Sequence, residues 1–211
     1  FQDNDIVVVA QKIVSKAEGR LVHLSTIEPS PKAIDLAEET EKDPRLVELI
    51  LRESSTVLRK RPGTIIVEHR RGFVCANAGI DHSNVKGDWG SDEDWVLLLP
   101  DDPDQSAGKI RQRLRTLTGC EVGVMIIDSH GRAWRMGTVG TCIGLAGVPG
   151  LVDLRGKPDM FGFQLRITQV AAGDELAGAA SLVMGQADEL IPAVHVRGFP
   201  YALRDASLNE L

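Results

Sequence analysis

The chain has 211 residues, 43% of them hydrophobic and 26% charged, a composition that is typical of a folded globular protein. Thirty acidic and 24 basic residues give a net charge of −6, so the surface as a whole does not attract nucleic acid or anionic membranes. Aromatic residues make up 4%, too few for a base-stacking surface. No apolar run has the length of a membrane span, about 18 residues.

The three cysteines, Cys75, Cys120 and Cys142, are widely spaced and form no CxxC pair. Their odd number and spacing exclude a disulfide framework and a structural zinc site, and they fit a reducing compartment such as the cytoplasm. We expect all three to be buried thiols. No signal peptide opens the chain, and because it begins with Phe1 rather than Met, we expect further residues before it.

The first half of the chain predicts one buried strand, two helices and a hairpin. Residues 6–10 form a continuous β-branched run, which indicates a buried strand. Ser30-Pro31 and Asp43-Pro44 each combine an N-cap residue with a proline at the first helical position, so a helix should follow each. Residues 64–68 and 73–76 resemble a hairpin that turns between them.

The middle of the chain continues this alternation of strands and helices. A short apolar strand is expected over 95–99, and the proline- and aspartate-rich segment 100–106 should cap a helix that Gly119 stops. A further strand over 122–127 should end abruptly at Asp128.

The last third contains an unusual number of glycines. Residues 131–162 hold eight of the 21 glycines, and so long an irregular stretch is expected to bind something or to wrap a partner. A helix rich in Ala and Gly over 168–185 and a strand over 193–196 complete the pattern. The sequence therefore predicts a mixed α/β fold, with sheets and hairpins, as one domain over 1–211.

Two aspartates are candidate metal ligands. Asp128 ends a buried strand, where α/β proteins usually place ligands, and Ser129 adds a second hard oxygen; such oxygens suit Mg²⁺ or Mn²⁺. On this pair alone, an Asp that caps the next turn is the simpler interpretation. Asp81 lies in a similar glycine-containing loop, where a turn is again the alternative.

Basic side chains close to Asp128 could bind an anion. Arg132 and Arg135 can each grip a phosphate or carboxylate with two hydrogen bonds, although a surface salt-bridge network explains them equally well. Lys12 and Lys16 follow the first strand and could reach a phosphate. No phosphate-binding P-loop, GxGxxG or HExxH motif is present, and Asp128-Ser129-His130 lacks the surroundings of a hydrolase triad.

Taken together, seven segments in order resemble the coenzyme F420:L-glutamate ligases. They are 14–20 (VSKAEGR), 79–84 (GIDHSN), 99–107 (LPDDPDQSA), 127–135 (IDSHGRAWR), 174–177 (DELA), 182–186 (LVMGQ) and 196–198 (VRG). The resemblance implies a GTP-dependent ligase that adds L-glutamate to the lactyl-phosphate carboxylate of coenzyme F420-0 or its precursor and extends a γ-linked tail. It also implies Mg²⁺ or Mn²⁺, assistance by K⁺, release of GDP, and an intertwined homodimer.

The same resemblance assigns residues to the site. Asp81 and Asp128 would bind metal, with Ser129 as a ligand of a second ion and Gln186 at a further metal-side position. Gln11, Lys16 and Asn84 match positions that contact the nucleotide. Arg132 and Arg135 are candidates from the residues alone, for steadying the phosphate or the incoming glutamate.

The chain departs from the family pattern at three places. The N-terminal Gly-Leu-Pro loop that touches the nucleotide would precede Phe1, Gln11 stands where some relatives have Ser, and Gly140 stands where relatives often have Asp. Some relatives also carry a C-terminal reductase-like domain. A metal-dependent phosphohydrolase and a non-catalytic nucleotide- or deazaflavin-binding module are the two alternative functions.

Overall fold

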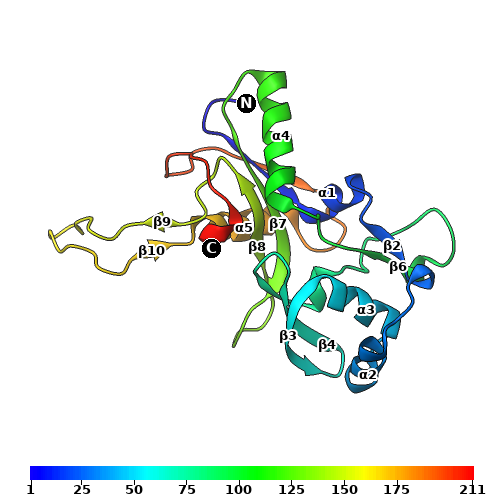
Figure 1. Cartoon of the computed structure of the whole chain (residues 1–211). Coiled ribbons are helices and arrows are strands. Elements are labelled where there is room, and N and C mark those ends of the chain that lie inside the picture. Colours follow the sequence, from blue (N-terminus) through cyan, green and yellow to red (C-terminus); the bar gives the residue numbers. More distant parts are fainter. The chain divides into compact units, whose positions relative to one another are not determined.

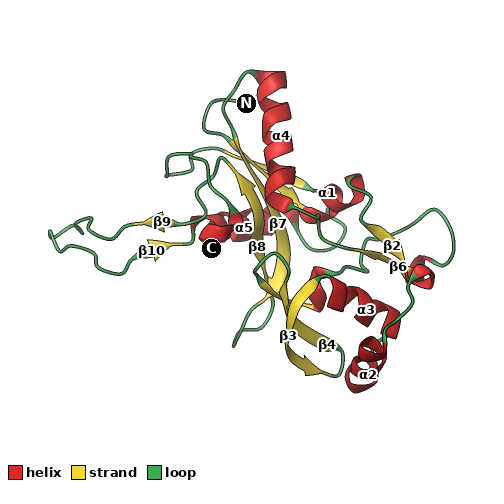
Figure 2. Cartoon of the chain, viewed as in Figure 1, coloured by secondary structure: helices red, strands yellow, loops and turns green.

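A computed structural model describes all residues, 1–211, and confirms the predicted mixed α/β class (Figures 1 and 2). The chain folds into two compact units, each built from segments that are separate in sequence. The first unit contains residues 1–10, 102–129 and 139–211, and the second contains residues 11–101 and 130–138. The prediction of a single domain over 1–211 stays a prediction.

The first unit is built on a four-stranded sheet with the strand order β11-β1-β7-β8. Its strands are β1 (Ile6–Ala10), β7 (Gly123–Gly131), β8 (Thr138–Ala146) and β11 (Ala193–Val196). β1 pairs in parallel with β7 and antiparallel with β11. The buried run of β-branched side chains predicted at 6–10 is therefore a central strand, as its continuous hydrophobicity requires.

Two helices complete this unit, α4 (Pro103–Thr118) and α5 (Ala172–Met184). Asp102 caps α4 by accepting a hydrogen bond from the backbone of Gln105, and Gly119 ends the helix in the left-handed conformation, as predicted. Ala177 and Ala180 of α5 are buried in the core that also contains residues of β1 and β7. Small side chains on α5 thus let the helix lie close to the strands.

Asp5 connects the first strand to the last. Its buried carboxylate accepts a two-pronged pair of hydrogen bonds from Arg197, both of 2.8 Å, and lies 2.8 Å from His195 Nε2. The Arg197 guanidinium is the main reason why the pKa of Asp5 is lowered far below its usual value. The predicted final strand is therefore held to β1 by side chains as well as by its backbone.

A long arm extends from the rest of the first unit (Figure 1). Its only strands are β9 (Val152–Asp153) and β10 (Gln169–Val170), which pair antiparallel, and a bridge joins Pro158 to Gln164 nearer the tip. The large apolar side chains toward the tip are exposed: Met160, Phe161, Phe163 and Ile167. A two-stranded arm has no core of its own in which to bury them.

The second unit contains three helices and two small sheets. The helices are α1 (Gln11–Ala17), α2 (Pro31–Thr40) and α3 (Pro44–Arg52), and the strands are β2 (Leu21–His23), β3 (Ser54–Arg61), β4 (Thr64–His69), β5 (Val74–Ala76) and β6 (Trp95–Leu97). β2 pairs with β6, and β3, β4 and β5 form an antiparallel sheet. Four short 3₁₀ turns lie at Leu24–Thr26, Asn77–Gly79, Asp92–Asp94 and Leu208–Glu210, the last of them in the first unit.

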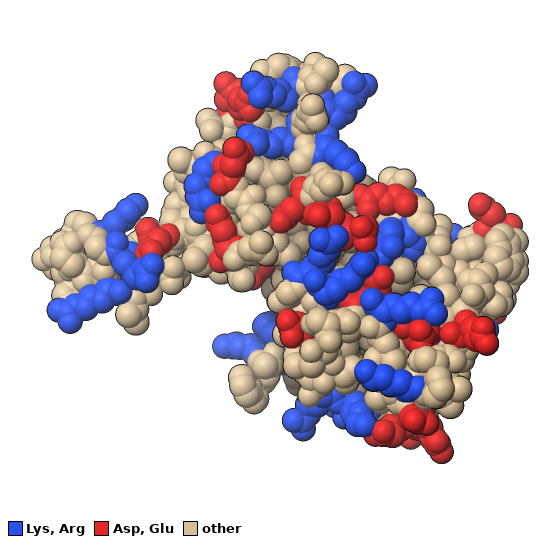
Figure 3. Space-filling model, viewed as in Figure 1, with Lys and Arg blue, Asp and Glu red and all other residues tan.

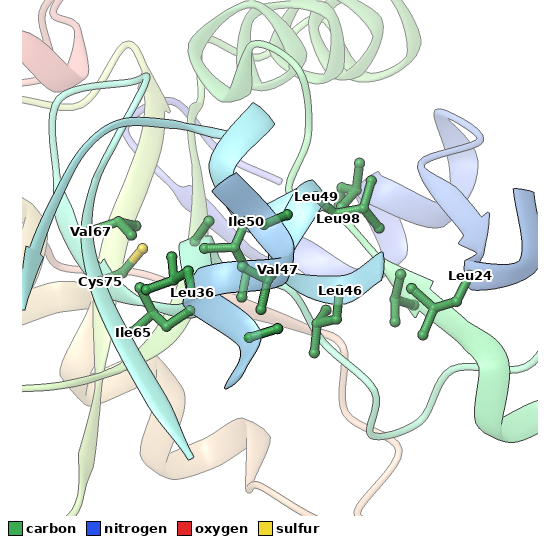
Figure 4. Packing of buried hydrophobic residues seen from close by; sticks show 14 residues of the cluster. Leu24, Leu36, Leu46, Val47, Leu49, Ile50, Ile65, Val67, Cys75 and Leu98 are labelled. Atoms are coloured by element: carbon green, nitrogen blue, oxygen red, sulfur yellow. The ribbon is translucent and has the colours of Figure 1, made fainter. Parts of the chain in front are cut away.

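The core of the second unit lies between α2, α3 and the β3-β4-β5 sheet (Figure 4). Val47 and Ile50 of α3 are fully buried, and they face Ile65 of β4 and Leu36 of α2. The proline-started helices were predicted from Ser30-Pro31 and Asp43-Pro44, and both aspartate and serine caps form as expected. The hairpin of β4 and β5 is likewise confirmed.

Several sequence predictions need correction. β7 does not end at Asp128 but continues to Gly131, because β8 lies beside it in the sheet. The glycine-rich stretch is not irregular throughout, since β8 occupies 138–146 of it. None of the three cysteines forms a disulfide, and Cys120 is half-exposed rather than buried because it follows the exposed end of α4. No helix has both the length and the apolar character needed to cross a membrane.

Replacing Ile50 by Ala is expected to destabilise the protein by about 2–5 kcal/mol, because Ile50 is fully buried in the core of the second unit and its loss leaves a cavity. The matched control is Ile34→Ala, which changes an exposed isoleucine of α2 and should shift stability by no more than about 0.5 kcal/mol. Denaturant unfolding measures both. Equal losses in the two variants would contradict the assigned core.

Candidate functional site

In the second unit, the start of α1 contacts the loop that contains Asp81. The side chain of Gln11 is buried, and its Nε2 donates a hydrogen bond of 2.6 Å to Asp81 Oδ2. Lys12 Nζ lies 3.1 Å from the same oxygen, as a partly exposed ion pair. One oxygen of the Asp81 carboxylate therefore has two donors, one neutral and one charged, from consecutive residues of α1.

The backbone of Asp81 is held by a separate pair of hydrogen bonds. Asp81 N donates to Leu97 O at 3.0 Å, and Leu97 N donates to Asp81 O at 2.9 Å. Leu97 is a fully buried residue of β6. Asp81 thus extends the β2-β6 sheet by one bridge, so both its main chain and its side chain are fixed.

The two lysines of α1 hold the rest of this loop. Lys12 Nζ also donates to the backbone carbonyl and the hydroxyl of Ser83, at 3.1 and 3.0 Å. Lys16 Nζ donates to the backbone carbonyl of Asn84 at 2.7 Å, and Asn84 itself has the left-handed backbone with φ of 56°. The structure therefore brings together four residues that the resemblance assigned to the site: Gln11, Lys16, Asp81 and Asn84.

Sequence reasoning missed the role of Lys12. It was considered only as a side chain that could reach a phosphate, whereas it bridges Asp81 and Ser83. Gln11 and Asp81 are 70 residues apart, and Lys12 lies next to Gln11 in the chain. No local pattern connects residues at that separation, so only the fold reveals the contact.

The other predicted metal ligands belong to the first unit. Asp128 and Ser129 are half-buried in β7 and directly follow the buried Ile127. Ile127 pairs in parallel register with Ala10, the last residue of β1. Asp128 therefore lies close to the end of the sheet at which β1 ends. α/β proteins usually bind ligands at the carboxyl ends of parallel strands.

Gln186 and Gly140 also lie in the first unit. Gln186 is exposed just after α5, and its Nε2 donates to Ser181 Oγ at 3.1 Å. A Cβ atom added at Gly140 would lie 2.4 Å from the carbonyl oxygen of Ala177 in α5. An aspartate at position 140 would therefore push α5 away from β8, so the glycine permits their close packing.

Arg132 and Arg135 lie in the turn between β7 and β8, within the second unit. Both side chains are exposed, as is Trp134, whose backbone is left-handed with φ of 56°. Neither arginine is a donor to Asp81 in the contacts described above. The salt-bridge network considered as an alternative for them does not form in this turn.

The donor set suits a hard divalent cation. Within each unit, no three His, Cys, Asp or Glu side chains gather closely enough to enclose an ion. Mg²⁺ is usually bound by one or two carboxylates together with waters and substrate phosphates, rather than by a full cage of protein ligands. Asp81 in the second unit and Asp128 in the first unit each present a carboxylate, which is the ligand type that such an ion prefers.

Blue basic and red acidic side chains alternate over short distances on the face of the protein shown in Figure 3. Lys12 and Lys16 contribute to the basic groups of the second unit, and Asp81 is one of the acidic ones.

Comparison with known proteins identifies the family. Residues 1–198 match the family model described as F420-0:gamma-glutamyl ligase. A protein of Methanopyrus kandleri named coenzyme F420:L-glutamate ligase is 54% identical over 94% of this chain and 76% of its own length. Relatives of the same name from Methanothermobacter thermautotrophicus and Methanococcus maripaludis are 53% and 44% identical, over 94% and 100% of this chain and 77% and 82% of their own lengths.

Sequence identities of 53–54% over 94% of the chain are high enough to establish family membership, and the matched residues extend over both compact units. They confirm the resemblance that the seven ordered segments indicated. The chain belongs to the F420-0:gamma-glutamyl ligase family and is an enzyme of the ligase class.

Proposed function

We propose that this chain is a GTP-dependent ligase that joins the amino group of L-glutamate to the lactyl-phosphate carboxylate of coenzyme F420-0. Further glutamates would be added through γ-linkages, and each cycle would release GDP and phosphate. The observation that carries the proposal is the 54% identity, over nearly the whole chain, to a relative named coenzyme F420:L-glutamate ligase. The cluster of Asp81, Gln11 and Lys12 is consistent with it, since it holds a carboxylate and a cationic side chain together.

The chemistry requires an activated acyl group. A carboxylate oxygen of the acceptor would attack the γ-phosphorus of GTP, the bond to the β-phosphate oxygen would break, and GDP would leave. The glutamate amine would then attack the acyl carbon of the resulting acyl phosphate, lose a proton and displace phosphate. Both carboxylate and triphosphate are anionic, so their approach needs positive charge close by.

The residues take roles that follow the resemblance. Asp81, Asp128, Ser129 and Gln186 would hold Mg²⁺ or Mn²⁺, and K⁺ would assist. When bound, the divalent ion supplies charge neutralisation between the two anions. Gln11, Lys16 and Asn84 would contact the nucleotide. Lys16 donates a hydrogen bond to the backbone of Asn84, which keeps the two residues next to each other.

Arg132 and Arg135 are proposed to grip the transferred phosphate or the incoming glutamate. Their guanidinium groups are exposed in the β7-β8 turn, only a few residues along the chain from Asp128. Arginine can bind either anion with two parallel hydrogen bonds. Cysteines that form no disulfide are consistent with the proposed cytoplasmic location.

We also infer that the chain works as a homodimer. The arm of residues 152–170 leaves Met160, Phe161 and Ile167 each at least 88% exposed. In Figure 3 its tip is mostly tan, with basic side chains nearer the middle of the arm. Monomeric proteins rarely expose several large apolar side chains together, and packing on a second copy would bury them.

The products test the reaction directly. With F420-0, L-glutamate, GTP and Mn²⁺, mass spectrometry should show acceptor species heavier by one or more glutamyl units, and GDP should appear only when both acceptor and glutamate are present. GTP turnover without glutamate and acceptor would instead indicate a phosphohydrolase. Nucleotide binding without any turnover would indicate a binding module.

Asp81→Asn and Asp128→Asn are each expected to lower ligase turnover by about a hundredfold or more, because an amide is a poor ligand for a hard divalent ion. Asp35→Asn is the matched control, since Asp35 is exposed on α2 and should keep full activity. Turnover is measured as GDP release, and circular dichroism checks folding. Full activity in a folded Asp128→Asn variant would refute the assigned site.

The arm can be tested by the double change Phe161→Ser and Ile167→Ser, which removes apolar side chains that a second copy would bury. Sedimentation velocity should show a shift from dimer to monomer. Leu117→Ser changes an exposed apolar residue of α4 and should leave the dimer intact. A dimer that survives the double change, or a monomeric unchanged protein, would exclude this interface.

A further inference from the structure

A second buried hydrogen bond lies behind the contact between Gln11 and Asp81. Ser15 Oγ donates to Gln11 Oε1 at 2.8 Å, from one helical turn further along α1. Ser15 is completely buried and Gln11 is 1% exposed. Three side chains therefore form a chain of hydrogen bonds that runs from inside the second unit out to the Asp81 carboxylate.

The chemistry of these groups fixes which atom donates and which accepts in each of these hydrogen bonds. An ionised carboxylate can only accept hydrogen bonds, so the nitrogen of the Gln11 amide must face Asp81. The amide oxygen then faces inward, where it needs a donor because no water reaches it. The Ser15 hydroxyl is that donor, and the reversed amide would place two oxygens against each other at Asp81 Oδ2.

We propose that Ser15 is a positioning residue for the metal-binding carboxylate, acting through the amide of Gln11. Ser15 locks the amide with its nitrogen outward, and the amide holds Oδ2 of Asp81. Lys12 also contacts Oδ2, so two donors from α1 fix this oxygen of Asp81. This inference rests on the proposed function, in which Asp81 is a metal ligand.

Such a lock affects metal affinity as well as catalysis. A carboxylate held in one orientation loses little freedom when an ion binds, and hydrogen-bonded partners behind metal ligands typically contribute about 10–100-fold in affinity. From the sequence, Gln11 was identified only as a residue that could contact the nucleotide. Its buried amide, bonded at both ends, gives it a second task that does not involve the nucleotide.

Mn²⁺ binding in the absence of nucleotide tests the proposal. Titration followed by the electron paramagnetic resonance of free Mn²⁺ should show affinity about tenfold weaker in Ser15→Ala and in Gln11→Met. Thr40→Val is the matched control: Thr40 is buried in the same unit, and its hydroxyl donates to Leu36 O at 2.7 Å, away from Asp81. It also loses a buried hydroxyl but should bind Mn²⁺ normally.

The double variant separates positioning from general damage. Because Ser15 acts only through Gln11, adding Ser15→Ala to Gln11→Met should weaken Mn²⁺ binding no further. Additive losses of Mn²⁺ affinity in the double variant would overturn the proposal. Unchanged Mn²⁺ affinity in Gln11→Met would also overturn it, and this result can be obtained even if Ser15→Ala does not fold. Asp81→Asn is the reference variant. If Asp81→Asn binds Mn²⁺ normally, the proposed metal role of Asp81 is wrong. If Asp81→Asn binds Mn²⁺ weakly but the Ser15 and Gln11 variants bind it normally, only the positioning inference is wrong.

Discussion

The hydrogen bond from the buried amide of Gln11 to Asp81 is the constraint on which the candidate site depends. It joins two segments that are 70 residues apart, and it does so at 2.6 Å with a side chain that water does not reach. A carboxylate left without such a partner would turn toward solvent. Held by Gln11, Lys12 and the backbone of Leu97, Asp81 keeps one orientation before any ligand arrives.

The fold explains why Gln11 stands where it does. β1 ends at Ala10, and α1 begins with the next residue, so the first side chain of the helix follows a central strand without an intervening loop. Ala10 is the register partner of Ile127, which precedes Asp128. Within the first unit, the parallel pairing of β1 with β7 therefore places Asp128 at the end of the sheet where β1 ends.

The sequence predicts the elements whose signals are local. The caps at Ser30, Asp43, Asp102 and Gly119 all lie where their chemistry places them, because a cap depends on only a few neighbouring residues. β3 was not predicted, since its residues are mostly exposed, three of the eight are basic, and they show no apolar alternation. β8 was missed because glycines interrupt it, although Gly140 is needed for close packing against α5.

In the candidate site too, the sequence indicated individual residues but not the contacts between residues that are distant in the chain. Resemblance pointed to Gln11, Lys16, Asp81 and Asn84 as separate positions, and the fold brings all four together in the second unit. The hydrogen bonds of Lys12 and Ser15 carried no signal in the sequence, because their meaning depends on what they contact. A serine or a lysine on a short helix does not indicate a function until its hydrogen-bond partners are known.

The most direct measurement is anomalous X-ray diffraction from crystals of the protein grown with Mn²⁺ and GDP. The account predicts an anomalous peak coordinated by the Asp81 carboxylate, with Gln11 still bonded to Oδ2 of Asp81. Manganese bound elsewhere, with no ion at the Asp81 carboxylate, would contradict it.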